Sequence, residues 1–386
     1  VMGIQRIEEL RDLINRETEG PVLSVFCRTD PRDPSSRSDT PGWMVALKNG
    51  LRDSIAGFEG SREEAQQVEK LAAKAEKRLI SASAVDRGRT VALFLSADGS
   101  IDSFNTFQIP VREDLVALEA GAVIWPMVDV LDRGQRTGLV LVSRDHIRML
   151  EWDDGHAKDL EESTYDLELG DWRDYRGSAR PNPSRGGQSV SNISAYEDRV
   201  TEWTARFIKD ASHAVAESAA ELKMDRLLIA AEGDLCSQFI DALPKNIQDL
   251  VVARVSTNLI DMTAAEVAEH LDPHMRDAWL KHVNEIGDQA LDRIHAGGRA
   301  AGGPDETLLA LAEGRVEHLL VDPFLEAKDA SLSDGARQAI VDAGEATLQE
   351  ASVELAIRTD ATVSSASAEE VPALAEAGGA LALLRY

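Results

Sequence analysis

The chain has 386 residues, of which 43% are hydrophobic and 28% are charged, and its net charge is −27. These values are typical of a folded globular protein long enough for two or three domains, and they exclude a largely disordered chain. Its longest apolar runs are far shorter than the roughly 20 residues that a membrane-spanning helix needs, so we expect no membrane partner. The acidic balance argues against a general nucleic-acid binder and against DNA as a partner, because such affinity depends on lysine and arginine.

Cysteine usage and the N-terminal residues indicate the compartment. Cys27 and Cys236 are the only cysteines, and each lies inside an apolar segment. This pattern excludes a disulfide framework and favours a reducing, cytoplasmic location. Charged residues from Arg6 to Asp12 interrupt any apolar core near the N-terminus, so we expect no signal peptide there.

Residues 1–133 predict a first domain of the mixed α+β type. Apolar residues at three- and four-residue spacing predict a helix over 4–19, which ends at Gly20-Pro21. Helices are further expected over 43–55 and 63–79, and strands over 22–27, 90–96, 103–109 and 121–124.

Residues 134–260 predict a second α/β domain that follows a hinge at 133–136. A hairpin across Arg144-Asp145 is expected from strands at 137–143 and 146–151, and a long helix from about Ala195 to Leu222. Strand, helix and strand then alternate over 227–231, 235–242 and 250–255, which predicts parallel strands joined by a crossover.

Residues 261–386 predict a third α/β domain. A long helix follows Thr263 and stops at the glycine-rich stretch Gly297–Gly303, which we interpret as a flexible connection. Helices are expected over 305–312, 334–343, 345–350 and 369–377, and strands over 316–321, 353–357 and 381–384. The predicted architecture is three small α/β domains in series.

One loop carries the pattern that points most directly to chemistry. It contains the tripeptide Gly186-Gly187-Gln188, set among Pro, Ser and Arg residues. Between Trp172 and Gln188 there are four arginines against one acid, Asp174. A basic island on an acidic body is expected where only that loop meets RNA, although the same composition also fits a solvated arginine-rich loop. The four arginines are Arg173, Arg176, Arg180 and Arg185.

Three ordered segments resemble the archaeal and eukaryotic class-one peptide release factors and their Pelota-like relatives. The first is Arg185-Gly186-Gly187-Gln188-Ser189, between a hairpin and a long helix. The second is Thr307–Val321, where a helix, a glycine turn and a short strand follow one another, and the third is the closing Gly378–Tyr386 with its Gly-Gly and Leu-Arg-Tyr. The resemblance covers nearly the whole chain and implies a three-domain fold.

The resemblance implies hydrolysis of the ester between a nascent peptide and its tRNA. Gly186, Gly187 and Gln188 would form the catalytic loop, and Arg185, Arg180, Arg176 and Ser189 would contact RNA. The expected partners are large-subunit ribosomal RNA and peptidyl-tRNA, and the need for a translational GTPase stays open. The resemblance implies no cofactor and no metal ion. Consistently, the helical pair His270 and His274 has Pro273 between its members and no acidic third ligand with a defined place.

The chain also departs from the stop-codon-reading members of this group. Their first domain carries an Asn-Ile-Lys-Ser tetrapeptide, and the corresponding stretch here, 54–65, has none. In this respect the chain is similar to the Vms-type release factors and their bacterial counterparts, which act on stalled ribosomes or large subunits. We therefore expect a codon-independent peptidyl-tRNA hydrolase. A non-catalytic ribosome-binding factor for hibernation or rescue, and a scaffold protein that kept the fold, remain the alternatives.

Overall fold

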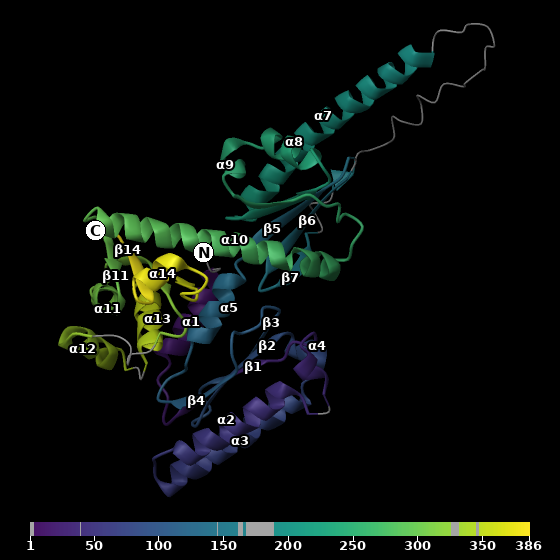
Figure 1. The fold of residues 1–386 in the computed structure, drawn as a ribbon. Helices are drawn as coiled ribbons and strands as arrows, with labels where there is room; N and C mark the ends of the chain where they lie inside the picture. Colours follow the sequence, from purple (N-terminus) through teal and green to yellow (C-terminus); the bar gives the residue numbers. More distant parts are fainter. Residues whose placement is uncertain are drawn as a thin grey trace. The chain divides into compact units, whose positions relative to one another are not determined.

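The computed structural model describes residues 4–38, 40–144, 146–160, 165–166, 189–325, 332–344 and 347–386. Side chains at 4–7, 84–85, 165–166 and 189–203 lie outside this description. The chain divides into two compact units, one of residues 1–135 with 276–386 and one of residues 136–275. Figure 1 shows the elements of each unit in colours that follow the sequence. Mixed helices and sheets confirm the predicted α/β class.

An antiparallel sheet forms the first part of the larger unit. Its strand order is β3-β2-β1-β4, and α2 (Gly42–Gly57) and α3 (Arg62–Ser81) cover one of its faces through a core that includes Leu47, Leu71 and Leu93. The strands and smaller helices are β1 (Val22–Arg28), β2 (Thr90–Ser96), β3 (Asp102–Phe107), β4 (Leu115–Glu119), α1 (Ile4–Asn15), η1 (Pro34–Arg37) and α4 (Ala84–Arg87).

The last strand of this sheet differs from the prediction. Residues 115–119 pair with β1, whereas the predicted strand at 121–124 does not form. The backbone N–H of Val123 donates to Ser24 Oγ at 3.0 Å, and that of Ile124 donates to a carboxylate oxygen of Glu350 at 2.7 Å. Side chains therefore satisfy the donors that a strand would have given to a ladder.

A second sheet forms the unit of residues 136–275. Its order is β10-β9-β5-β6-β7, with β8 paired to β6; β5, β9 and β10 are parallel, and β5, β6 and β7 are antiparallel. The predicted hairpin and parallel crossover are both confirmed. The elements are β5 (Thr137–Val142), β6 (His146–Asp153), β7 (His156–Asp159), β8 (Tyr165–Asp166), α7 (Ser189–Glu221), β9 (Leu227–Ala231), α8 (Leu235–Ala242), α9 (Lys245–Gln248) and β10 (Val251–Val255).

A third sheet, of order β11-β14-β12-β13, belongs to the larger unit. Two strands of this sheet were not predicted. Strand β11 lies inside the glycine-rich stretch that was interpreted as a flexible connection, and it pairs with β14. Strand β13 is short and polar, and it pairs with β12. Helix α10 (Ala264–His295) belongs to the second unit as far as Met275 and to the larger unit from Arg276. The remaining elements are α5 (Trp125–Arg133), β11 (Ala300–Gly302), α11 (Pro304–Ala312), β12 (Val316–Val321), α12 (Asp334–Ala343), α13 (Leu348–Arg358), β13 (Thr362–Ser365), α14 (Pro372–Glu376) and β14 (Ala380–Leu384).

The prediction of a strand at 353–357 is wrong, because these residues lie within helix α13. Thr347 caps this helix by accepting a hydrogen bond from the N–H of Glu350 at 3.2 Å. Val353, Ala356 and Ile357 are buried together with the acids Glu350 and Glu354. A helix buried on most sides shows no clear 3.6-residue period, so its sequence reads like that of a buried strand.

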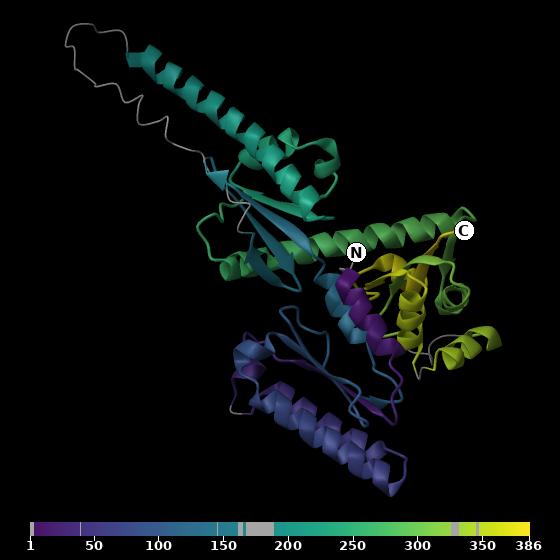
Figure 2. The ribbon, with the colours of Figure 1, turned by 180° about the vertical axis from the view of Figure 1, so that it is seen from behind.

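One continuous hydrophobic core joins the first and third sheets of the larger unit. It contains Phe26 and Phe94 from the first sheet together with Leu319 and Val363 from the third. Helices α1 and α5 contribute to this core, and Figure 2 shows both beside the third-sheet helices. No helix in the described part of the chain is long and apolar enough to cross a bilayer.

Candidate functional site

The predicted catalytic loop falls in a segment outside the described residues. Gly186, Gly187 and Gln188 lie there, as do Arg176, Arg180 and Arg185. Ser189 is the first residue of α7, and its side chain is outside the description as well. The roles assigned to these residues therefore stay predictions, and the structure contributes the scaffold on either side of them. Trp172 also lies in that segment.

The scaffold consists of one strand pair before the loop and one helix after it. Strand β8 pairs antiparallel with β6, with Tyr165 opposite Ile147 and Asp166 opposite His146. The chain then runs through 167–188 and begins α7 at Ser189. The tripeptide thus ends directly before a helix.

Helix α7 is fixed to the second sheet by its C-terminal half. Phe207, Ala211, Val215 and Ala219, at four-residue spacing, are all buried against sheet residues such as Ile229. The helix has 33 residues and is therefore about 50 Å long. Ser189 precedes the first of these buried contacts by about 27 Å along the axis. The N-terminus of the helix therefore lies far from the residues that pack it on the sheet.

Helix α7 begins earlier than the sequence predicted. The helix was expected to start at about Ala195, but the structure starts it at Ser189. No glycine or proline lies between these two positions to stop the helix. As a result, the glycine pair and Gln188 directly precede a helix N-terminus, where backbone N–H groups and the helix dipole favour an anion such as phosphate.

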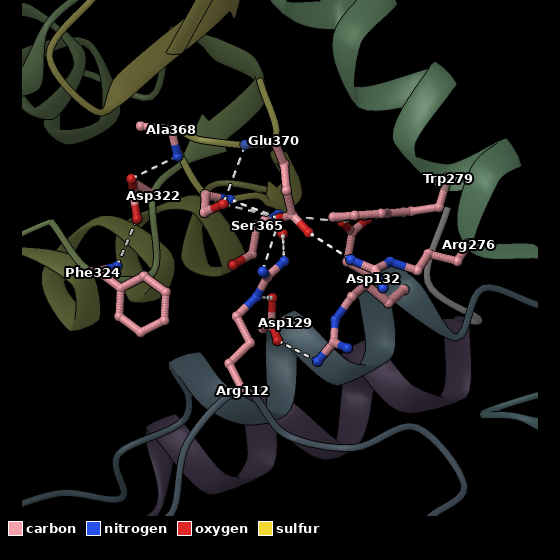
Figure 3. A network of polar contacts seen from close by, with 12 residues as sticks. Arg112, Asp129, Asp132, Arg276, Trp279, Asp322, Phe324, Ser365, Ala368 and Glu370 are labelled. Carbon is pink, nitrogen blue, oxygen red and sulfur yellow. Dashed lines mark hydrogen bonds and ion pairs between the residues drawn. The ribbon is translucent and has the colours of Figure 1, made fainter. Parts of the chain in front are cut away.

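A cluster of hydrogen-bonded charged residues lies in the larger unit and is centred on Arg112 (Figure 3). Its guanidinium donates to Asp129 at 2.9 Å, to Glu370 at 2.8 Å and to the carbonyl of Ser365 at 3.4 Å. Asp129 also accepts a bond from Arg133 at 2.5 Å. Burial opposes the charge on Arg112, but the two carboxylates outweigh it and raise the pKa of the guanidinium. The same guanidinium holds the pKa of Glu370 below its usual value despite partial burial.

Asp132 forms the buried end of this cluster. Its carboxylate accepts hydrogen bonds from Trp279 Nε1 and Gln135 Nε2, each at 2.8 Å, and from Ser365 N at 3.2 Å. Burial raises the pKa of Asp132 even though these donors oppose the shift. The arrangement is structural, because the carboxylate is 1% exposed and its oxygens face protein donors.

No sequence pattern predicted this cluster. Two aspartates in the mainly apolar helix 125–133 were the available signal, because a buried acid needs partners. Trp279 lies in the long helix that was predicted after Thr263, and nothing in the sequence marked it as a partner of these acids. Among the described residues, no group of three or more His, Cys, Asp or Glu side chains could hold a metal ion.

Comparison with protein families identifies the central part of the chain. Residues 123–276 match the model of "Bacterial archaeo-eukaryotic release factor family 10". The matched segment contains the Gly-Gly-Gln tripeptide and both of its flanking elements, β8 and α7. No protein of curated function gives a significant match.

Solved structures of release factors and Pelota proteins are similar to the chain at low sequence identity. An archaeal translation termination factor, aRF1, is 15% identical over 99% of this chain and 98% of its own, with a TM-score of 0.26. A ribosome-bound archaeal Pelota is 14% identical over 98% and 94%, with a TM-score of 0.40. Dom34 of S. cerevisiae is 11% identical over 77% and 86%, with a TM-score of 0.38. The family match covers residues 123–276, and it shows that this segment is similar to a bacterial release factor family of the archaeo-eukaryotic type.

Proposed function

We propose that this protein acts on ribosomes and hydrolyses peptidyl-tRNA without reading a codon. The observation that carries the proposal is the position of Gly186-Gly187-Gln188 immediately before α7, inside the segment that matches a release factor family. Related proteins support the setting by what their descriptions say. One Pelota is described as ribosome-bound, and Dom34 is described as interacting with Hbs1. By analogy, a partner protein could deliver this factor.

The chemistry needs a water molecule in a crowded RNA cavity and stabilisation of the charge that develops on the ester. Two consecutive glycines permit backbone dihedrals that other residues avoid, and they let the chain approach RNA without a Cβ clash. The backbone N–H of Gln188 would donate to the developing oxyanion or the departing hydroxyl. Its side-chain amide would position the attacking water. The remaining groups would come from the ribosome and the tRNA.

Arginines on the approach to the tripeptide would position it. Arg176, Arg180 and Arg185 would pair with phosphates, which fixes orientation without reading sequence. The N-terminus of α7, next to Ser189, would favour a phosphate in the same region. Because the C-terminal half of α7 is packed on the sheet, it would hold this end of the helix in place.

Codon independence is supported by the connection between α2 and α3. The residues there are Phe58, Glu59, Gly60 and Ser61, in place of an Asn-Ile-Lys-Ser tetrapeptide. Ser61 and Glu64 instead form a capping box, in which each side chain accepts a hydrogen bond from the other's backbone N–H. These side chains start a helix, and we expect them to make no contact with a codon.

A peptide-release assay on defined substrates tests this function. Purified protein is mixed with 70S complexes that carry either a stop or a sense codon in the A site, with 50S–peptidyl-tRNA complexes and with free peptidyl-tRNA. We expect release from at least one ribosomal substrate, no dependence on the codon and no release from free peptidyl-tRNA. Binding to ribosomes without release on any substrate would instead identify a non-catalytic factor.

A further inference from the structure

Helix α3 of the larger unit carries an exposed row of lysines. Lys70, Lys74 and Lys77, called the lysine stripe below, follow one another at four- and three-residue spacing and are all exposed. This spacing puts them on one face of the helix. The opposite face, with Leu71, Ala75 and Leu79, is buried against the first sheet. The stripe therefore faces solvent along about 10 Å of the helix.

Three of the four acidic residues of α3 lie away from the stripe, while the exposed Glu63 lies on the same face two turns before Lys70. Glu69 and Glu76 each directly precede a stripe lysine and are therefore rotated by about 100° around the helix axis. Glu76 contacts Lys48 of α2 at 3.4 Å, which draws it to the side of the helix hairpin. Glu64 is engaged in the capping box at the start of the helix. In a chain with 68 acids, this separation leaves an exposed helix face that is locally positive.

The described residues neutralise the stripe only partly. Asp102 contacts Lys74 at 2.6 Å and also contacts Arg78, so one carboxylate faces two cations. Within the described part of the chain, Lys70 and Lys77 have no recorded ion pair. Exposed Gln66 and Gln67 lie one turn before Lys70 and add amide donors to the same face.

We propose that the lysine stripe binds the phosphate backbone of a structured RNA without reading its sequence. Along about 10 Å a nucleic-acid strand carries several phosphates, which lysine ammonium groups neutralise as point charges. A membrane surface fits less well, because the stripe offers lysines and glutamines and lacks the aromatic and leucine residues that an interfacial helix inserts. That the RNA is ribosomal rests on the proposed function. The stripe would give the first sheet a contact that does not depend on a codon.

Salt-dependent binding to 70S ribosomes tests the stripe. The test variant combines Lys70→Gln, Lys74→Gln and Lys77→Gln, and the matched control combines Lys158→Gln, Lys245→Gln and Lys281→Gln, which removes the same charge from exposed positions elsewhere. A third variant with arginine at all three stripe positions keeps the charge. Affinity is measured by sedimentation between 50 and 300 mM KCl, and circular dichroism confirms that each variant is folded.

We expect the slope of log affinity against log salt concentration to become shallower by about 2 to 3 in the stripe variant. Its affinity at 100 mM KCl should fall at least about 10-fold, while the control and the arginine variant stay close to wild type. An unchanged slope would contradict RNA binding by the lysine stripe, but it would not contradict the proposed function. A loss of affinity without a change in the salt slope would indicate that the stripe contacts a protein surface, and it would also contradict RNA binding by the stripe. If wild-type protein binds no ribosome, both proposals fail; if it binds but releases no peptide, only the hydrolase proposal fails.

Discussion

The indole Nε1 of Trp279 donates a hydrogen bond of 2.8 Å to the buried carboxylate of Asp132, 147 residues away in the sequence. Asp132 lies three residues before the chain leaves the larger unit, and Trp279 lies three residues after the chain returns to it. Gln135, at the point of exit, bonds to the same carboxylate. Arg276, at the point of return, contacts Glu370 at 3.4 Å. The cluster therefore ties together the two ends between which residues 136–275 are inserted.

Trp279→Phe is expected to destabilise the larger unit by about 1 to 3 kcal/mol, because the buried carboxyl group of Asp132 loses one of its hydrogen-bond donors. Trp152→Phe is the matched control. Trp152 is equally buried, at 1% exposed, but its Nε1 has no hydrogen-bond partner among the described residues. This control should cost clearly less. Calorimetric unfolding of both variants makes the comparison, and equal losses would show that the bond to Asp132 contributes nothing measurable.

Glu370→Gln should give a pH-dependent loss of stability. The pKa of Glu370 lies below its ordinary value of 4.5 in the folded state. A carboxyl group with a depressed folded-state pKa contributes stability above its unfolded pKa, and this contribution disappears as the pH falls through the folded value. The difference in Tm between wild type and variant should therefore be full at pH 7 and shrink below about pH 4.5. A difference that stays constant down to pH 3 would contradict the ion pair with Arg112.

Glu350→Ala is expected to weaken the start of α5. The carboxylate of Glu350 accepts the backbone N–H groups of Ile124 at 2.7 Å and Trp125 at 3.1 Å, which a helix start leaves unsatisfied. Its loss should cost about 1 to 3 kcal/mol. Glu354→Ala is the control, since Glu354 is also buried on α13 but pairs with Arg358. Hydrogen exchange should show faster exchange at Ile124 and Trp125 only in the first variant.

Gly50→Ala should disturb the contact between α2 and the first sheet. A Cβ at this position would lie 2.7 Å from Cβ of Val116, so the helix or strand β4 must shift. We expect a cost of about 1 to 3 kcal/mol from overpacking. Gly57→Ala, near the end of the same helix, meets nothing within 4 Å and should be neutral or stabilising. Urea unfolding of the two variants distinguishes these outcomes, and equal stability would contradict the close packing.

Much of the fold could be predicted from local patterns. The strands at 90–96, 227–231 and 316–321 were predicted with their observed bounds, because each is a short run of mainly apolar, strand-forming residues. The predicted order of a helix, a glycine turn and a strand over 307–321 is also confirmed. Gly314 lies between α11 and β12 with a φ of +67°. The division at 133/134 and 260/261 stays a prediction.

What escaped prediction depends on contacts distant in sequence. Residues 353–357 are buried on most sides of α13, so no periodicity distinguished helix from strand. Strand β11 exists because β14, about 80 residues later, pairs with it. Similarly, Asp132 acquires its partners only when Trp279 and Ser365 are folded around it. The candidate site is the reverse case: its tripeptide is evident in the sequence, while its catalytic role depends on RNA that the chain itself does not supply.

Single-turnover peptide release by Gln188→Ala tests the central claim most directly. The measurement compares wild type, this variant and Asn182→Ala, a matched amide-to-alanine change in the same loop, on the ribosomal substrate that wild type hydrolyses. Ribosome binding is measured in parallel. The hydrolase proposal predicts that Gln188→Ala binds like wild type but loses at least about 100-fold in rate, as expected when a group that acts in the transition state is removed, while Asn182→Ala stays active. Equal release by wild type and Gln188→Ala would contradict the assignment of the tripeptide as the active loop.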